Sequence, residues 1–100
     1  MLIHTVFFWL KADTSEADRE SFREALKALA AIPTVRQLYV GTPAAVPDRP
    51  VVDKSYDFGL TVLFDDVAGQ TAYQEHPLHD AFVAGHARPL AEKVLVYDAD

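Results

Sequence analysis

Apolar residues fill both sides of the segment from residue 2 to residue 10. This segment is rich in β-branched and aromatic residues and predicts a β-strand. One face would carry Leu2, His4, Val6, Phe8 and Leu10, and the other Ile3, Thr5, Phe7 and Trp9. A strand with one solvated face would alternate apolar with polar residues instead. We therefore expect the sheet that contains this strand to be covered on both sides.

The segment from Ser15 to Ala31 predicts an amphipathic helix. Ser15 and the two residues before it are N-cap candidates, and Glu16 and Asp18 are suited to a first helical turn. Charged residues fill one side, and Pro33 would stop the helix. The apolar residues that recur at helical spacing are Phe22, Ala25, Leu26, Leu29 and Ile32.

The remaining pattern predicts three strands and a second, interrupted helix. The strands are expected at 35–42, 55–64 and 91–97, with a proline-containing loop at 44–54 that is either a flap over a pocket or an excursion without function. Asp65 and Asp66 would cap a helix at 67–75, and a second helical segment would run from Pro77 to about Ala87 and be broken by Pro89. The resulting β-α-β-β-α-β order predicts an α+β, ferredoxin-like fold. Such a fold has a four-stranded antiparallel sheet with both helices on one face.

The apolar first strand also predicts an assembly. Two helices can cover only one side of four strands, and an exposed apolar face of several hundred Å² is unusual on a monomer. A symmetric dimer that packs sheet on sheet would cover it. We therefore expect a homodimer through the sheet face, a dimeric α+β barrel.

Composition narrows the class of protein. The 100 residues suffice for one domain, at 1–100, and 50% of them are hydrophobic, which argues against disorder. The net charge of −6 and the scattered basic residues argue against nucleic acid or membrane partners. No cysteine is present, so disulfides and thiolate chemistry are excluded. Without a signal-peptide pattern or an apolar run of about 20 residues, we expect a soluble, cytoplasmic protein.

The stretch from Tyr73 to His79 is the strongest candidate for chemistry. It places a phenol and two imidazoles within seven residues, with Pro77 between the imidazoles. Pro77 suits the first position of a helix, which would put His79 in its first turn, where the helix dipole disfavours the imidazolium. A neutral imidazole there could act as a base. Alternatively, Tyr73 and His79 form a hydrogen bond that only fixes the bend.

The other histidines allow structural and functional interpretations. His4 lies among apolar neighbours and is either a satisfied core residue or a pocket wall that orients His79. His76 precedes Pro77 and suits a helix cap, with a pocket role as the alternative. His86 is expected at the surface. A metal site formed by His76, His79 and His86 does not match a recognised ligand spacing, so we expect neither metal nor cofactor.

The chain resembles the stress-responsive A/B barrel (Dabb) family over nearly its whole length. The resemblance rests on His4 within the first strand and on the run Tyr-Gln-Glu-His-Pro-Leu-His at 73–79, followed by Phe82. It also rests on Ser-Tyr-Asp-Phe at 55–58 and on Lys-Val-Leu-Val-Tyr-Asp at 93–98. The resemblance implies a dimeric α+β barrel with a pocket between helices and sheet.

One branch of this family, similar to the present chain, consists of polyketide cyclases that need no metal or cofactor. The resemblance to that branch implies His79 as the base, Tyr73 as the assisting residue and His4 as a site residue. That branch also carries a histidine in its third strand, where this chain has Phe58. This difference makes the same substrate doubtful. Among the aromatic residues, Phe8 and Phe58 are candidates to line the pocket.

Three functions remain open at this point. The first is a cofactor-independent cyclase or lyase that acts on a polyketide or aromatic precursor, with His79 as base and Tyr73 assisting. The second is a non-catalytic, stress-responsive or small-ligand-binding protein that uses the same pocket. The third is a cofactor-independent monooxygenase of the wider dimeric α+β barrel class.

Overall fold

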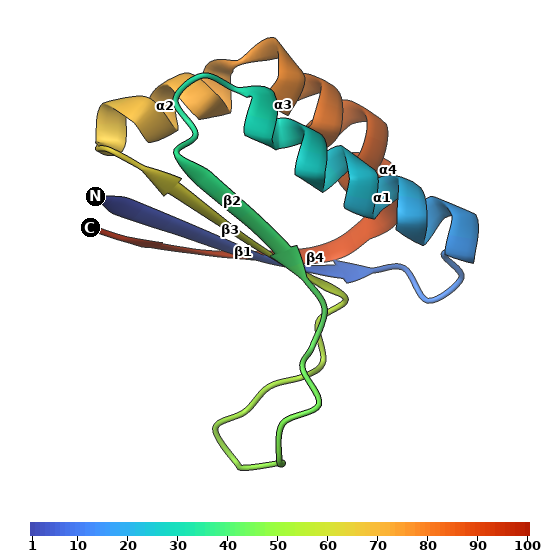
Figure 1. Ribbon diagram of the computed structural model, residues 1–100. Coiled ribbons are helices and arrows are strands. Elements are labelled where there is room, and N and C mark those ends of the chain that lie inside the picture. Colours follow the sequence, from blue (N-terminus) through green and yellow to red (C-terminus); the bar gives the residue numbers. More distant parts are fainter.

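A computed structural model describes all residues from 1 to 100. Four antiparallel strands form one sheet in the order β2-β3-β1-β4, and all the helices lie on one side of it (Figure 1). This confirms the predicted ferredoxin-like α+β fold. Its elements are β1 (Leu2–Leu10), α1 (Glu16–Ala28), η1 (Leu29–Ala31), β2 (Gln37–Gly41), β3 (Phe58–Phe64), α2 (Val67–Glu75), α3 (Pro77–Phe82), η2 (Val83–Ala87), α4 (Arg88–Leu90) and β4 (Ala91–Ala99).

The core fills the space between the helices and one face of the sheet. The even-numbered residues of β1 are buried there, whereas none of its odd-numbered residues is. Phe22 and Leu26 of α1 are completely buried against this face. The core contains an aromatic group in which Phe22 stacks on Phe58 and contacts Phe82 edge-on. Burying apolar side chains on one face of each element therefore fixes the helical layer on the sheet.

Both long helical segments begin with the caps expected from the sequence. The Ser15 hydroxyl accepts a hydrogen bond from the Asp18 amide, and an Asp66 carboxylate oxygen accepts one from the Gly69 amide. Each cap satisfies a backbone N–H group that has no partner within the helix. The predicted helix starts are therefore confirmed, and α1 ends in the short 3₁₀ turn η1 before Pro33.

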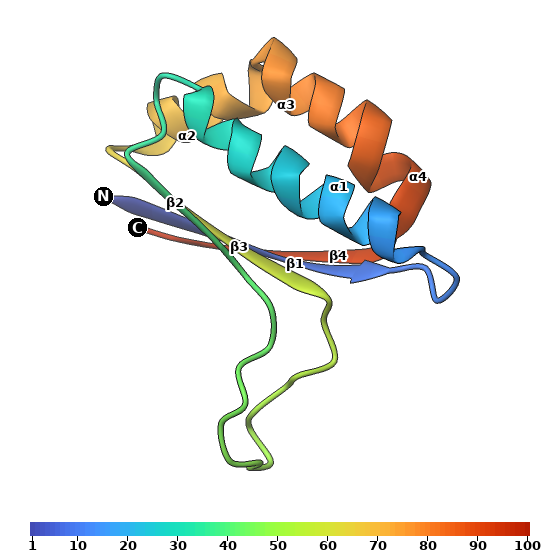
Figure 2. The ribbon, with the colours of Figure 1, turned by 45° about the vertical axis from the view of Figure 1, so that its right-hand side comes forward.

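The second helical segment continues further than the sequence predicted. It passes from α3 through a π-helical stretch, η2, into α4, and only then turns into β4 (Figure 2). Pro89 was expected to break this segment but lies inside α4. The π-helical turns directly before α4 change the hydrogen-bond spacing of the helix, and the helix ends one residue after Pro89, at Leu90. The predicted break at Pro89 is therefore wrong.

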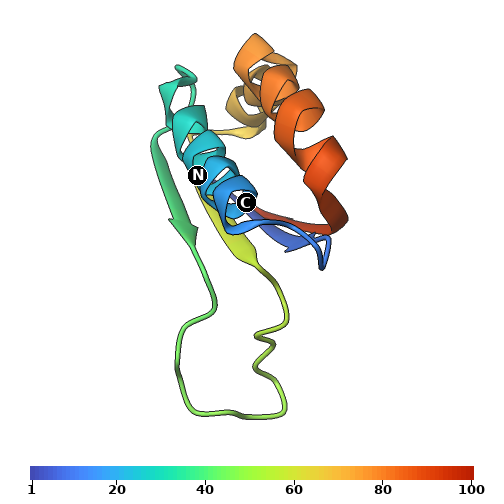
Figure 3. The same ribbon diagram turned by 90° about the vertical axis from the view of Figure 1, so that its right-hand side faces the viewer.

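The connection between β2 and β3 is longer than expected because β3 begins at Phe58 rather than Ser55. The residues before Phe58 make local contacts instead: Ser55 donates to the Asp53 carboxylate through both its amide and its hydroxyl. The loop extends from the end of the sheet away from the helical layer (Figures 1 and 3). It therefore does not lie over the space between helices and sheet.

None of the helices combines the length and the apolar character needed to span a lipid bilayer.

Candidate functional site

The bend at Pro77 places the predicted site residues. Tyr73 lies in the last turn of α2, and His79 is the third residue of α3. His76 joins the two helices with extended backbone angles, and its Nδ1 atom accepts a hydrogen bond from the Leu78 amide (3.1 Å). His76 is therefore the N-cap of α3, the structural alternative that the His-Pro sequence had suggested.

Tyr73 and His79 both face a cavity between the helices and the sheet. Its volume is about 260 Å³, slightly below the roughly 300–1,000 Å³ of typical sites for drug-sized ligands. The helices α2, α3 and η2 form one wall, and the strands β1, β3 and β4 form the other. The cavity is lined by His4, Val6, Phe8, Leu60, Tyr73, Gln74, His79, Phe82, Val83, Ala87, Val94 and Val96.

Tyr73 is almost completely buried, with 1% of its surface exposed. Its ring meets His79 edge-on, with 4.9 Å between the ring centroids, and it also contacts Phe64 and His4. Burial raises the pKa of the Tyr73 phenol well above its usual value, because the charged phenolate would lose its hydration. Tyr73 therefore stays protonated and can donate a hydrogen bond to a group in the cavity.

His79 is half-buried, and its pKa lies below the usual value of 6.5. Burial is the main cause, and the nearby His4 acts in the same direction, whereas Asp80 raises the pKa. The largest cause is therefore the loss of solvent around the ring. The imidazole is therefore neutral near pH 7 and able to accept a proton.

No hydrogen bond joins Tyr73 to His79, so the alternative in which such a bond fixes the bend is wrong. The two rings are in aromatic edge contact, and neither side chain is engaged by another protein group through a hydrogen bond. Their polar atoms are thus available to a ligand.

His4 forms the opposite wall of the cavity and is paired with a residue that the sequence analysis did not single out. Its Nδ1 atom lies 2.5 Å from a carboxylate oxygen of Asp98, and 3% of His4 is exposed. The two residues are direct partners in the β1–β4 register. The Asp98 carboxylate accepts this hydrogen bond from Nδ1, which fixes the orientation of the His4 ring at the cavity wall.

Two predicted pocket residues do not line this cavity. His76 is occupied as the helix cap, and Phe58 is buried in the core, where its ring stacks on Phe22 and lies beneath the guanidinium groups of Arg19 and Arg23. Phe8, in contrast, does line the cavity. Leu60, two residues further along the same face of β3, lies beside the cavity instead.

A signal for Asp98 was present in the sequence. Asp98 has the same alternation phase as Val94 and Val96, and the end of the last strand lies opposite the start of the first in the predicted fold. No group of three or more histidine and acidic side chains is placed to hold a metal ion, so His76, His79 and His86 do not converge.

Comparison with known proteins connects the chain to one family. The model of the stress responsive A/B barrel domain (Dabb) matches residues 2–100. A Dabb family protein with a ferredoxin-like fold from Mesorhizobium loti MAFF303099 shares 34% identity, with a TM-score of 0.80 over 99% of this chain and 94% of that one. No protein with a curated function matches.

Two further solved structures are similar. A dimeric ferredoxin-like protein of unknown function from Thermobifida fusca YX is 26% identical, with a TM-score of 0.79 over 98% of this chain and 88% of that chain. The hydroxynitrile lyase from Passiflora edulis is 22% identical, with a TM-score of 0.80 over 98% and 90% of the two chains. At that identity the lyase supports the fold alone.

Proposed function

Because this chain belongs to the stress-responsive A/B barrel family, we propose that it is a small acid–base enzyme, a cofactor-independent cyclase or lyase. Its substrate would be a small aromatic or polyketide compound that carries carbonyl groups. The observation that supports this best is the pair formed by Tyr73 and His79, a phenol held protonated and an imidazole held neutral, in edge contact at one cavity.

In the proposed reaction, His79 removes a proton from the carbon next to a carbonyl group. Tyr73 donates a hydrogen bond to the enolate oxygen as its negative charge develops. The enolate carbon then attacks a second carbonyl carbon, and the oxygen of that carbonyl takes the proton back from His79. The reverse sequence breaks the same carbon–carbon bond, so one site serves an aldol closure and a retro-aldol cleavage.

His4 would position the reacting groups. The short bond to Asp98 holds its ring at the cavity wall, next to Tyr73. A buried imidazole that is hydrogen-bonded to a carboxylate keeps one ring orientation, which is how catalytic histidines are commonly held. We assign His4 to binding and orientation, and Phe8 to the apolar wall.

The cavity volume favours a small substrate. About 260 Å³ suits a single aromatic ring with short substituents better than an extended chain. Phe58, which stands where the polyketide-cyclase branch carries a histidine, lies outside the cavity lining, and β3 contributes only the apolar Leu60 to it. A short aromatic β-hydroxyketone therefore fits this site better than a long poly-β-ketone.

The first test uses the cleavage of 4-hydroxy-4-phenylbutan-2-one to benzaldehyde and acetone, followed by benzaldehyde absorbance. We expect His79→Gln to lower the rate about 100- to 10,000-fold and Tyr73→Phe to lower it on the order of 100-fold. His76→Asn serves as the control, because asparagine can cap α3 and residue 76 lies outside the cavity lining.

An unchanged rate in His79→Gln would contradict the role of His79 as base. Binding of the β-hydroxyketone without any turnover would instead favour the non-catalytic, ligand-binding alternative. Circular dichroism of each variant shows whether its fold is retained.

We also propose that the functional unit is a homodimer formed through the open face of the sheet. Aromatic side chains gather there, with Tyr56 against both Phe7 and Trp9, and a hollow of about 280 Å³ lies between them and β4. The helical layer covers only the opposite face (Figure 2). The dimeric relative from T. fusca supports this assembly.

A further inference from the structure

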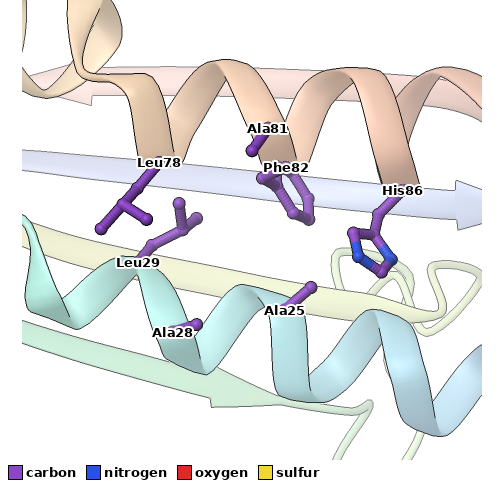
Figure 4. Close-up of a pocket in the computed structure, with 7 residues that line it drawn as sticks. All are labelled: Ala25, Ala28, Leu29, Leu78, Ala81, Phe82 and His86. Atoms are coloured by element: carbon purple, nitrogen blue, oxygen red, sulfur yellow. The ribbon is translucent and has the colours of Figure 1, made fainter.

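A second hollow lies close to the proposed site. It is a groove of about 210 Å³ between α1 and the α3–η2 segment (Figure 4). Three alanines, Ala25 and Ala28 on α1 and Ala81 on α3, leave this space open between the two helices. Apart from His86, the residues that line the groove are all apolar.

Phe82 is the one residue that lines both the groove and the cavity of Tyr73 and His79. Its side chain is buried, with 6% exposed. Its ring is held from several sides: it meets Phe22 edge-on at 5.4 Å and Phe8 at 5.9 Å, and His86 stacks nearly parallel to it at 6.1 Å. Phe82 therefore forms the partition between the two hollows.

We propose that Phe82 is a specificity-determining residue, whose ring closes the inner cavity against the groove and limits the length of ligand that fits beside Tyr73 and His79. This inference rests on the proposed function of the Tyr73–His79 site. It adds the residue that sets the size of the substrate. Alone, the inner cavity is smaller than a typical site for a drug-sized ligand, whereas the two hollows joined would fall within that range.

The chemistry of the groove indicates which ligands a shorter side chain at residue 82 would admit. With alanine and leucine side chains on its walls, the groove offers no hydrogen-bond partner except His86. The extension of the ligand would therefore be an alkyl chain, with its polar head remaining between His79 and Tyr73.

The local backbone places the partition at a change of helix type. Phe82 is the last residue of α3, and the π-helical stretch η2 begins at the next residue. Wide helical turns of this kind are frequent at functional sites because they alter the direction of the side chains that follow. Phe82 thus lies at the point where the segment changes from α-helical to π-helical turns.

The experiment measures binding of 4-n-alkylphenols, from methyl to hexyl, by titration calorimetry. In the wild type we expect affinity to rise with each methylene until the chain meets Phe82, and then to fall. In Phe82→Ala the rise should continue to longer chains, at about fourfold for each additional buried methylene. In Phe82→Leu, the longest alkyl chain that still raises affinity should lie between those of the wild type and Phe82→Ala. This variant also keeps the test possible if Phe82→Ala does not fold.

Leu78→Ala is the matched control. It also removes an apolar side chain from the groove but leaves the partition in place, so the wild-type length limit should remain. The same limit in the wild type and in both Phe82 variants would overturn the inference while leaving the Tyr73–His79 site intact. If 4-methylphenol binds to none of the proteins, the inner site itself is wrong, and the role of Phe82 with it.

Discussion

The two faces of β1 have nearly the same apolar character but different surroundings. Phe8 is covered by the helical layer and is 4% exposed, whereas Phe7, its neighbour on the opposite face, is only half-buried. Further along the open face, Tyr97 and Tyr39 are about 60% exposed. Phe7 and Phe8 are the same residue type in the same strand, so their different exposure results from what the fold places above each face.

Because of this difference, the two faces are suited to different roles. The covered face carries the candidate chemistry, with His4 paired to Asp98 beneath Tyr73. The open face carries aromatic side chains but no cluster of titratable groups comparable to the cavity. A second copy on the open face would bury apolar surface without obstructing the cavity, which lies between the sheet and the helices. β1 can therefore contribute side chains to the candidate site on one face and to a dimer interface on the other.

The largest expected effect is on the free energy of unfolding, which should respond differently to a substitution on each face. Phe8→Ala removes a ring from the close-packed core and should lower the free energy of unfolding by about 3–5 kcal/mol. Phe7→Ala leaves the helical layer untouched and should cost the protomer considerably less. Urea unfolding of both variants at several protein concentrations measures the difference.

The dependence on concentration provides the control for this pair. The loss in Phe8→Ala should be similar at all concentrations, whereas the loss in Phe7→Ala should grow with concentration if the open face is buried in a dimer. Equal losses at every concentration would contradict the distinction between the faces.

The next effect concerns assembly. Leu95 lies opposite Phe7 on the open face, so Leu95→Asp would place a carboxylate in the proposed interface. An unpaired charge there, repeated by symmetry, should weaken the dimer on the order of 100-fold or more. Sedimentation velocity at micromolar concentration should show a dimer for the wild type and a monomer for the variant.

Thr71→Asp is the control for charge, because Thr71 is exposed on α2 at a distance from the open face. That variant should sediment like the wild type. A monomeric wild type would exclude the sheet-to-sheet dimer altogether.

The smallest effect is a pH dependence that originates on the covered face. The pKa of His79 is lower in the folded protein than the value of 6.5 in the unfolded chain. Between these two values the unfolded state binds more protons, so stability decreases as pH falls through 6.5 towards the folded pKa. Below the folded pKa, His79 contributes no further change.

His79→Gln should therefore reduce the loss of stability between pH 7.5 and pH 5, measured by urea unfolding, with His86→Gln as a comparison in the same helical segment. The same titration predicts that turnover rises with pH through a midpoint below 6.5, as the imidazole becomes a base. An identical pH dependence in His79→Gln and the wild type would show that residue 79 is not the group responsible.

Local sequence determined the elements of this protein and their order. The alternation in β1, the helical spacing around Phe22 and the caps at Ser15 and Asp66 depend on residues close in the chain, and each was predicted correctly. Local signals were less exact where other hydrogen bonds competed with strand pairing. Ser55, for example, bonds to Asp53 and to the Trp9 ring instead of extending β3.

The candidate site was only partly predictable. The run from Tyr73 to His79 identified two residues that share the cavity, because a helix bend lies within local sequence. The partner of His4 lies 94 residues away, and the role of Phe82 as a partition depends on α1, α3 and β1 together. Periodicity in the sequence determines which face of each element is apolar. Only the packing of the elements decides which side chains meet across the core and which apolar face remains open, because those contacts join residues far apart in the chain.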